Sequence, residues 1–318
     1  MLIKNGIESI PTLQHEIRRL AREKNAIILA HNYQLPEVQE VGDFVGDSLG
    51  LSLEATKTDA DMIIFCGVHF MAESAKILNP EKRVFLPNLS AGCSLADSIT
   101  PESLTDWKER YPDHTVVTYI NSSAEVKALS DYCCTSANAI SVVRHVPNQK
   151  ILFTPDRNLG NWVKKHVPEK DIVVYDGVCP VHDVLRGANV KKTKSDHPDA
   201  IIVAHPECRE DVLALADEIC STSGMLNVVE KYPNAKTFLI ATEWGVIHQL
   251  KLRYPDREFI VADGCIGCRL HCPYMKMIDL PAVLRSLEEE LFEVTVDPDV
   301  RERALIALQR MMSAPRDN

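Results

Sequence analysis

A threefold internal repeat limits the fold of this 318-residue chain more than any other feature. In each repeat an apolar run ends at a polar residue, a hydroxyl residue follows, and a later apolar run ends near a cysteine. The three polar residues are His31, Asn121 and His205. From them, the hydroxyl residue lies 17, 15 and 16 positions further on, and the cysteine lies 62, 58 and 60 positions further on. Self-similarity of this regularity indicates three copies of one structural unit.

Each unit is predicted to be of the α/β class. Short apolar runs, such as residues 26–30, alternate with segments of helical periodicity, such as residues 11–24. This alternation predicts βα units with parallel strands and right-handed crossovers. We therefore predict three similar three-layer α/β/α domains, related by a pseudo-threefold axis. Their predicted boundaries are 1–103, 104–189 and 190–318.

Two further amphipathic segments, residues 281–290 and 297–312, follow the last repeat. We predict that both are helices and assign them to the third domain. They are expected to pack over that domain and to carry no chemistry of their own.

The overall charge and the N-terminal sequence narrow the functional class. A net charge of −10 argues against a nucleic acid or a membrane surface as partner. The N-terminus lacks the pattern of a signal peptide, and no apolar run approaches membrane-spanning length, so we expect a cytoplasmic protein. In a reducing compartment, ten cysteines favour metal binding, catalysis or buried thiols over disulfides.

Polar residues at the strand ends point to one shared site. Ligands of parallel sheets bind beyond the carboxyl ends of the strands, where His31, Asn121 and His205 are expected. The hydroxyl residues Ser48, Ser136 and Ser221-Thr222 each precede a helical pattern. Any one of them alone is ordinarily a helix N-cap. Three at matching positions around one axis favour an anionic substrate held at helix N-termini in a central cleft.

One cysteine per repeat would place three thiolates around the same axis. The spacing nominates Cys93, Cys179 and Cys265. Three cysteines suit a 4Fe-4S cluster with one open iron, a Lewis acid that can polarise a substrate. The residues alone therefore favour an iron–sulfur hydro-lyase-like enzyme. Two alternatives stay open: an iron–sulfur electron carrier, which would need a fourth ligand, and a zinc-stabilised protein using only the cysteines at 265–272.

Other candidate residues carry weaker signals. His182 lies three residues after Cys179, where a metal-binding turn would position it, and Glu207 lies at a strand end, where it could act as a general base. The alternative for His182 is a histidine of the core, and the alternative for Glu207 is a solvated carboxylate in a loop. The remaining cysteines of the apolar strand patterns are predicted to be buried structural thiols: Cys66, Cys133, Cys134, Cys208 and Cys220.

The motifs assembled above resemble those of the quinolinate synthase family, the iron–sulfur enzymes of de novo NAD biosynthesis. They run in the family's order over nearly the whole chain: His31-Asn-Tyr33, Gly46-Asp47-Ser48-Leu49, Ala91-Gly-Cys93-Ser94, Tyr119-Ile-Asn121, Cys134-Thr-Ser136-Ala137-Asn138, Cys179-Pro-Val-His182, His205-Pro-Glu207-Cys208, Ser221-Thr222-Ser223-Gly224-Met225 and Cys272-Pro-Tyr-Met-Lys-Met277.

This resemblance implies three α/β/α domains with the active site at their junction. It also implies an enzyme that condenses iminoaspartate (iminosuccinate) with dihydroxyacetone phosphate, a transferase- and dehydratase-type reaction that releases phosphate and water and yields quinolinate. The implied cofactor is a 4Fe-4S cluster with one iron open to substrate. The implied partners are these small molecules, with a functional link to an enzyme that produces iminoaspartate.

Carried over motif by motif, the resemblance assigns roles to individual residues. The cluster ligands would be Cys93, Cys179 and Cys272. Proton transfer and orientation would fall to Tyr33, His182 and Glu207. The substrates would be held by His31, Ser48, Tyr119, Asn121, Ser136, His205, Glu207 and Thr222.

The third cluster ligand is where spacing and resemblance differ. The spacing predicts Cys265 as this ligand. The resemblance instead implies Cys272, which immediately precedes the Pro-Tyr-Met-Lys-Met motif. We follow the resemblance, because the spacing between equivalent residues can differ by several positions from one repeat to the next. Cys265 and Cys268 would then be either a thiol–disulfide switch or a reduced bystander pair.

Overall fold

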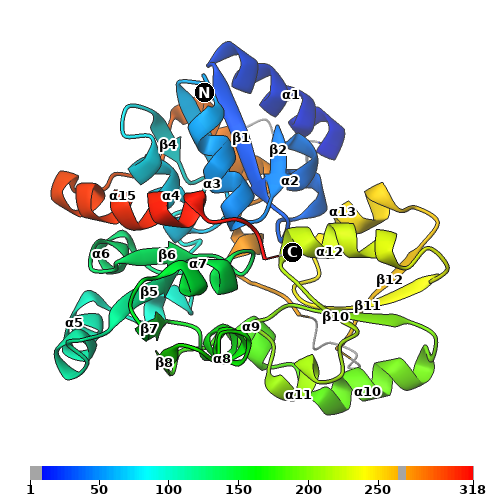
Figure 1. Ribbon diagram of the computed structural model, residues 1–318. Helices are drawn as coiled ribbons and strands as arrows, with labels where there is room; N and C mark the ends of the chain where they lie inside the picture. The colour runs from blue at the N-terminus through cyan, green and yellow to red at the C-terminus, as the bar shows by residue number, and fades with distance from the viewer. Residues whose placement is uncertain (1–8, 264–269, 318) are drawn as a thin grey trace.

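The computed structural model describes residues 9–263 and 270–317 (Figure 1). In this part of the chain the strands form three four-stranded sheets, and all strand pairs within them are parallel. Each sheet has the same order: the second strand of the unit lies at one edge, followed by the first, third and fourth. Helices flank each sheet, so the predicted triplicated α/β/α fold is confirmed.

The first unit occupies the upper part of Figure 1, in blue and cyan. Its elements are α1 (Ile10–Glu23), β1 (Ala26–His31), α2 (Pro36–Val41), β2 (Phe44–Gly46), α3 (Ser48–Lys57), β3 (Met62–Cys66), α4 (His69–Leu78), β4 (Arg83–Phe85) and the 3-10 turn η1 (Ala96–Ser98). All five residues of β3 are buried. A continuously buried strand is expected where helices cover both faces of a parallel sheet.

The second unit lies below the first in Figure 1, in green. It consists of α5 (Pro101–Arg110), β5 (Thr115–Tyr119), α6 (Ala124–Ala128), β6 (Tyr132–Cys134), α7 (Ala139–His145), β7 (Lys150–Thr154), α8 (Arg157–His166), β8 (Asp171–Val174) and α9 (Pro180–Asp183).

The third unit lies beside the second, in yellow-green and yellow. Its elements are α10 (Gly187–Asp196), β9 (Ile201–Ala204), α11 (Glu210–Leu213), β10 (Glu218–Ile219), α12 (Thr222–Val228), η2 (Val229–Lys231), β11 (Thr237–Ala241), α13 (Val246–Arg253), β12 (Glu258–Val261) and η3 (Met275–Met277).

The internal repeat extends to single hydrogen bonds. In each unit an aspartate just before the second strand accepts a hydrogen bond of 2.8 Å from a backbone N–H near the start of the first strand, 15 residues earlier. The aspartate's own N–H donates back to the carbonyl of that same residue. The pairs are Asp43 with Ile28, Asp131 with Val116, and Asp217 with Ile202. The same hydrogen-bonded arrangement therefore occurs in all three units.

The five cysteines predicted to be buried structural thiols are all buried, as predicted: Cys66, Cys133, Cys134, Cys208 and Cys220. They lie in or beside strands and make no disulfide among the described residues. They contribute to the core as small apolar side chains.

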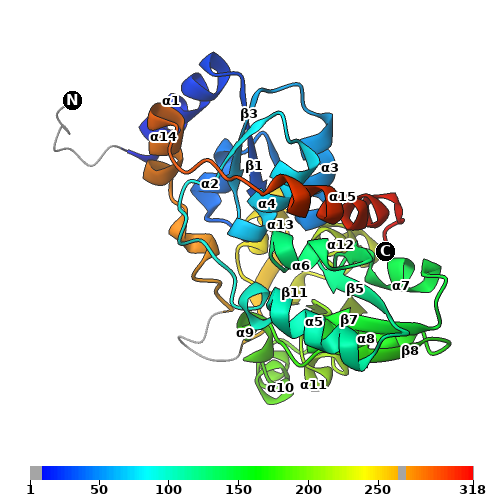
Figure 2. The same cartoon turned by 90° about the vertical axis from the view of Figure 1, so that its left-hand side faces the viewer.

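The two C-terminal helices form as predicted, but their predicted packing is wrong. α14 (Leu280–Glu289) packs against α1 and β3 of the first unit, and α15 (Pro298–Ser313) packs against α3 and α4 of the first unit and α6 and β6 of the second. Figure 2 shows α14 beside α1 and α15 lying between the first and second units. Amphipathic periodicity predicts that one face of a helix is buried, but it does not say against which neighbour.

Among the described residues, none of the helices combines the length and the apolar character that crossing a membrane requires.

Candidate functional site

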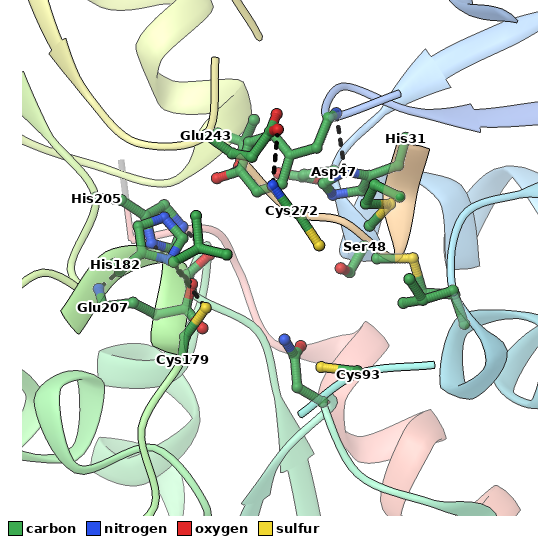
Figure 3. Close-up of a pocket in the computed structure, with 18 of the residues that line it drawn as sticks. His31, Asp47, Ser48, Cys93, Cys179, His182, His205, Glu207, Glu243 and Cys272 are labelled. Atoms are coloured by element: carbon green, nitrogen blue, oxygen red, sulfur yellow. Dashed lines mark hydrogen bonds and ion pairs between the residues drawn. The ribbon is translucent and has the colours of Figure 1, made fainter. Parts of the chain in front are cut away.

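A pocket lies where the three units meet, and all thirteen residues to which the resemblance assigns roles line it. The first unit contributes residues at or just after the end of β1, at the start of α3 and after β4, and the other two units contribute residues from comparable places. The nominated residues in this lining are His31, Tyr33, Ser48, Cys93, Tyr119, Asn121, Ser136, Cys179, His182, His205, Glu207, Thr222 and Cys272. Figure 3 shows several of these side chains converging on a common space.

Two of the hydroxyl residues that line the pocket directly follow the residue that caps their helix. The side chain of Asp47 caps α3 by accepting from the N–H of Gly50 at 2.8 Å, and that of Ser221 caps α12 by accepting from the N–H of Gly224 at 3.2 Å. Ser48 and Thr222 are then the first residues of their helices and line the pocket.

The second unit differs from the expectation of a free helix N-terminus. The N–H groups of Ile140 and Ser141, in the first turn of α7, donate to the carboxylate of Asp317 at 2.9 and 2.8 Å. Ser136 lies before this helix, and its Oγ is 3.1 Å from Nε2 of His205. The C-terminal segment therefore occupies part of the surface that was predicted to receive an anion.

Glu207 and two histidines form a buried group on one side of the pocket. The Oε2 atom of Glu207 lies 3.1 Å from Nδ1 of His182 and 3.2 Å from Nδ1 of His205. The two imidazole rings stack, with centroids 4.8 Å apart. All three side chains are almost fully buried, so the electrostatic interactions between them act in a medium of low dielectric constant.

A chain of hydroxyl groups connects this histidine pair to Tyr33. The side chain of Thr242 lies 2.8 Å from Nε2 of His182 and 2.6 Å from the hydroxyl of Tyr33, which also accepts from Thr222 at 3.1 Å. The first and third units thus contribute to one hydrogen-bonded network that reaches His182 in the second. Such a network fixes the orientation of each member.

The pKa values in this pocket are set mainly by burial. Burial lowers the pKa of His31 and of His182 to about 4, so both imidazoles are neutral near pH 7. It raises the pKa of Tyr33 well above its ordinary value, which keeps that hydroxyl protonated. Burial also opposes ionisation of Glu207, but His182 and His205 outweigh it, and the net pKa of Glu207 lies below its usual range.

The N–H of Tyr33 donates to Nδ1 of His31 at 3.1 Å. Because Nδ1 accepts, the neutral ring carries its proton on Nε2. The N–H of Glu207 makes the equivalent contact with Nδ1 of His205, at 3.3 Å. The same turn therefore follows the first strand in two of the three units.

Three thiols, one from each predicted domain, face the same space in Figure 3: Cys93, Cys179 and Cys272. Burial raises the pKa of all three, and that of Cys93 to about 12. A bound metal would have to supply the charge that ionises them. Separately, ligand atoms of Cys179, His182 and Glu207 lie within 4.8 Å of one another and form a possible metal-binding group among the described residues.

Comparison with known proteins decides the family. The family model described as "Quinolinate synthetase A protein" matches residues 15–313. A quinolinate synthase of Geobacter metallireducens is 52% identical over 306 residues, covering 96% of this chain and 99% of that protein. One from Thermodesulfovibrio yellowstonii is 50% identical over 298 residues, covering 94% and 97%. This chain belongs to the quinolinate synthase family. The resemblance drawn from its motifs is confirmed.

An iron–sulfur cluster, which that resemblance implies, fits the donor set of this family member. Thiolate sulfur is the ligand that Fe–S clusters require, and the pocket offers three thiols unpaired by any disulfide among the described residues. Two buried polar atoms in the lining, Oδ1 of Asn121 and Oε1 of Glu207, have no hydrogen-bond partner in the described part of the chain. Buried polar atoms without a partner are costly, so they indicate where a ligand would bind. Cys265 and Cys268 lie outside the described residues, so the predicted switch stays a hypothesis.

Some residues of the site were not nominated from the sequence. Asp47 and Glu243 line the pocket, Asp156 accepts a hydrogen bond from the backbone of Cys179, and Lys276 pairs with Glu243. Asp47 and Lys276 lie inside motifs of the resemblance, and Asp156 and Glu243 each follow a strand by two residues. Applying the strand-end argument to the third strand of each unit would have found the last two.

Proposed function

We propose that this chain condenses iminoaspartate with dihydroxyacetone phosphate to form quinolinate, with release of phosphate and water. One observation carries the proposal: the thirteen residues to which the resemblance assigns roles come from all three units and line a single pocket, in which three thiols face the buried group of His182, His205 and Glu207. An enzyme that produces iminoaspartate would supply the first substrate.

Cys93, Cys179 and Cys272 would hold a 4Fe-4S cluster. When bound, such a cluster supplies an open iron that acts as a Lewis acid towards a substrate oxygen. The remaining chemistry falls to the side chains around it.

Both substrates are anions, and neutral donors would hold them. Among the described residues, the pocket lining contains no lysine or arginine. It offers instead the hydroxyls of Ser48, Ser136 and Thr222 and the protonated Nε2 of the neutral His31. Hydrogen bonds from neutral groups fix the orientation of an anion without holding it as strongly as an ion pair would. Holding two reactants together also removes much of the entropic barrier to joining them.

The proton transfers suit the ionisation states in the pocket. The condensation requires protons to move between carbon, nitrogen and oxygen atoms, and Glu207 is ionised and could accept one. Tyr33 stays protonated and could donate to a developing negative charge. His182 is neutral and lies 3.1 Å from Glu207 and 3.3 Å from the Sγ atom of Cys179, so it would orient both.

The decisive experiment combines anaerobic purification, iron, sulfide and zinc analysis, and an assay of quinolinate formation from the two substrates. The wild-type protein should carry iron and sulfide with a visible charge-transfer band. Cys93→Ala should lose both the band and the activity, while Cys66→Ala, which removes a buried thiol of the same unit, should keep both. Full activity in Cys93→Ala, or zinc in place of iron, would refute the proposal.

A second pair of variants separates the two nominations for the third ligand. If Cys272 is the ligand, Cys272→Ala should lose the cluster and Cys265→Ala should retain it. The reverse result would restore the ligand that the spacing of the repeat nominates.

A further inference from the structure

Two buried carboxylates occupy equivalent places in the second and third units. Asp156 lies two residues after β7 ends at Thr154, and Glu243 lies two residues after β11 ends at Ala241. Both are fully buried. The corresponding residue of the first unit, two positions after β3, is Val68, which has no hydrogen-bonding side chain.

Asp156 connects the start of α8 to the turn that carries Cys179. Its Oδ1 accepts from the N–H of Leu159 at 2.6 Å, an ordinary N-cap bond. Its Oδ2 accepts from the N–H of Cys179, 23 residues away, at 3.1 Å. Capping needs only the first of these bonds. The second fixes the backbone from which the thiol of Cys179 projects into the pocket.

Glu243 makes the equivalent connection to Cys272. Its Oε1 accepts from the N–H of Cys272 at 3.1 Å, and its Oε2 accepts from the N–H of Gly245 at 2.7 Å. Lys276, four residues beyond the cysteine, lies 3.1 Å from the same carboxylate and 4.1 Å from the ring centroid of Trp244. The loop with Cys272 is therefore fixed at both the cysteine and the lysine.

The contacts of Asp156 and Glu243 indicate that the two residues have the same role. A buried carboxylate is costly unless several donors satisfy it, and in both cases one donor is the backbone of a nominated cluster ligand. Groups behind metal ligands commonly orient them, and their loss weakens metal binding by about 10–100-fold. Within the described residues, no side chain accepts from the N–H of Cys93.

We propose that Asp156 and Glu243 are positioning residues of the cluster site, which fix Cys179 and Cys272 through their backbone N–H groups, while Cys93 lacks such support and is the more mobile ligand. The proposal rests on the proposed function, because it takes these three cysteines as cluster ligands. It also explains why Cys272 is the better third ligand: it repeats the support that Cys179 receives.

The test compares Asp156→Asn and Glu243→Gln with the wild-type protein after anaerobic cluster reconstitution. Each substitution keeps the side-chain shape but replaces one accepting oxygen by an NH2 group, so one of the two backbone bonds is lost. We expect the visible band to decay about 10–100-fold faster in the presence of a chelator, with a lower iron and sulfide content.

Matched controls are Asp131→Asn and Asp217→Asn. These aspartates make the same kind of carboxylate–amide bond in the same two units, but near the amino-terminal start of the first strand, at the end of the sheet opposite to that of the three nominated cluster ligands. They should lower the melting temperature of the cluster-free protein and leave the rate of cluster loss unchanged. If the Asp156 and Glu243 variants lose the cluster no faster than these controls, the proposal is wrong.

A second measurement uses the wild-type protein, so it does not depend on whether a variant folds. In the cluster-free wild-type protein, amide hydrogen exchange should be slower at Cys179 and Cys272 than at Cys93, because only the first two amides are bonded to buried carboxylates. Equal exchange at all three would contradict the proposal. A wild-type protein that takes up no iron and sulfide would refute the proposed function instead, while this exchange pattern would still be measurable.

Discussion

His31 is a neutral base buried inside the protein, and its burial makes the free energy of unfolding depend on pH. Its pKa is lowered to about 4, mainly by burial, whereas an unfolded chain would titrate it near its ordinary value of about 6.5. Below that value the unfolded state binds a proton that the folded state does not. Stability should therefore fall as the pH drops from about 6.5 towards 4.

The His31→Gln variant tests this prediction. It keeps a polar side chain at the position and removes the titration, so the loss of stability between pH 6.5 and 4 should be smaller than in the wild type, by on the order of 2–3 kcal/mol. Chemical denaturation at a series of pH values measures it. Parallel pH profiles for the two proteins would contradict the prediction.

Glu207 is the residue whose charge the pocket most clearly maintains. Glu207→Gln keeps the shape of the side chain and removes the ionised carboxylate that His182 and His205 contact. We expect the turnover rate to fall by roughly 10²–10⁴-fold, the range typical of a lost general base. Iron and sulfide contents should stay at the wild-type level, because the three cysteines are unchanged. A turnover rate within a few-fold of wild type would exclude the role of base.

At the scale of elements, α15 is the clearest case in which tertiary packing decides what a sequence pattern means. Leu308 and Met311 of this helix are fully buried, whereas Ile306 is 52% exposed. The carbonyl of Met311 also accepts from the side chain of Asn138, in the second unit, at 2.9 Å. The helix therefore contributes to the contact between the first and second units.

Leu308→Ala should lower the free energy of unfolding by about 2–5 kcal/mol, because it leaves a cavity in this contact. The matched control, Ile306→Ala on the same helix, should change it by less than about 1 kcal/mol. Denaturation in urea measures both. Equal effects would mean that α15 does not bury its apolar face in solution.

The helices of the repeats show where prediction of helix caps from sequence ends. The sequence predicts a hydroxyl at or near the start of α3 and α12, and both helices begin there. Which of two adjacent polar residues becomes the cap depends on backbone angles that composition does not reveal. Asp47 and Ser221 take that position, and the next residues, Ser48 and Thr222, line the pocket.

At the scale of the whole molecule, the C-terminal segment joins two units beside the pocket. Arg316 donates to both carboxylate oxygens of Asp47, at 2.7 and 3.0 Å, and the next residue, Asp317, accepts from the start of α7. Asp47 is buried in the first unit, and α7 belongs to the second. The last residues of the chain therefore bridge the first and second units.

Arg316→Ala should destabilise the protein at neutral pH by roughly 1–2 kcal/mol, less than a fully buried pair because Arg316 is partly exposed. Burial opposes ionisation of Asp47, but Arg316 outweighs it and the net pKa is lowered. A depressed carboxyl pKa gives stability that is present above the unfolded value, about 4, and is lost as the pH falls further.

The difference in stability between wild type and Arg316→Ala should consequently shrink below about pH 4. Thermal denaturation at neutral and acidic pH measures it, with Arg303→Ala, an exposed arginine of α15, as control. A difference that is independent of pH would show that the Asp47 pair is not its source.

The fold and most of the site could be predicted because they repeat. The spacing between His31, Ser48 and Cys93 recurs in the other two units, and the resemblance supplied Tyr33, Tyr119 and the choice of Cys272. These are properties of short segments and of their distances along the chain. A βα unit forms largely from its own residues, so its pattern is visible in the sequence.

Tertiary structure alone decided which distant residues support that site. Asp156 and Glu243 bond to backbone amides 23 and 29 residues away, and Arg316 reaches Asp47 across 269 positions. These contacts exist because three units pack around one centre and the C-terminal segment returns to it. A side chain that hydrogen-bonds to the backbone of a distant loop produces no periodic pattern in the sequence. The sequence by itself therefore determined which residues line the pocket, and the tertiary packing determined which contacts hold them in place.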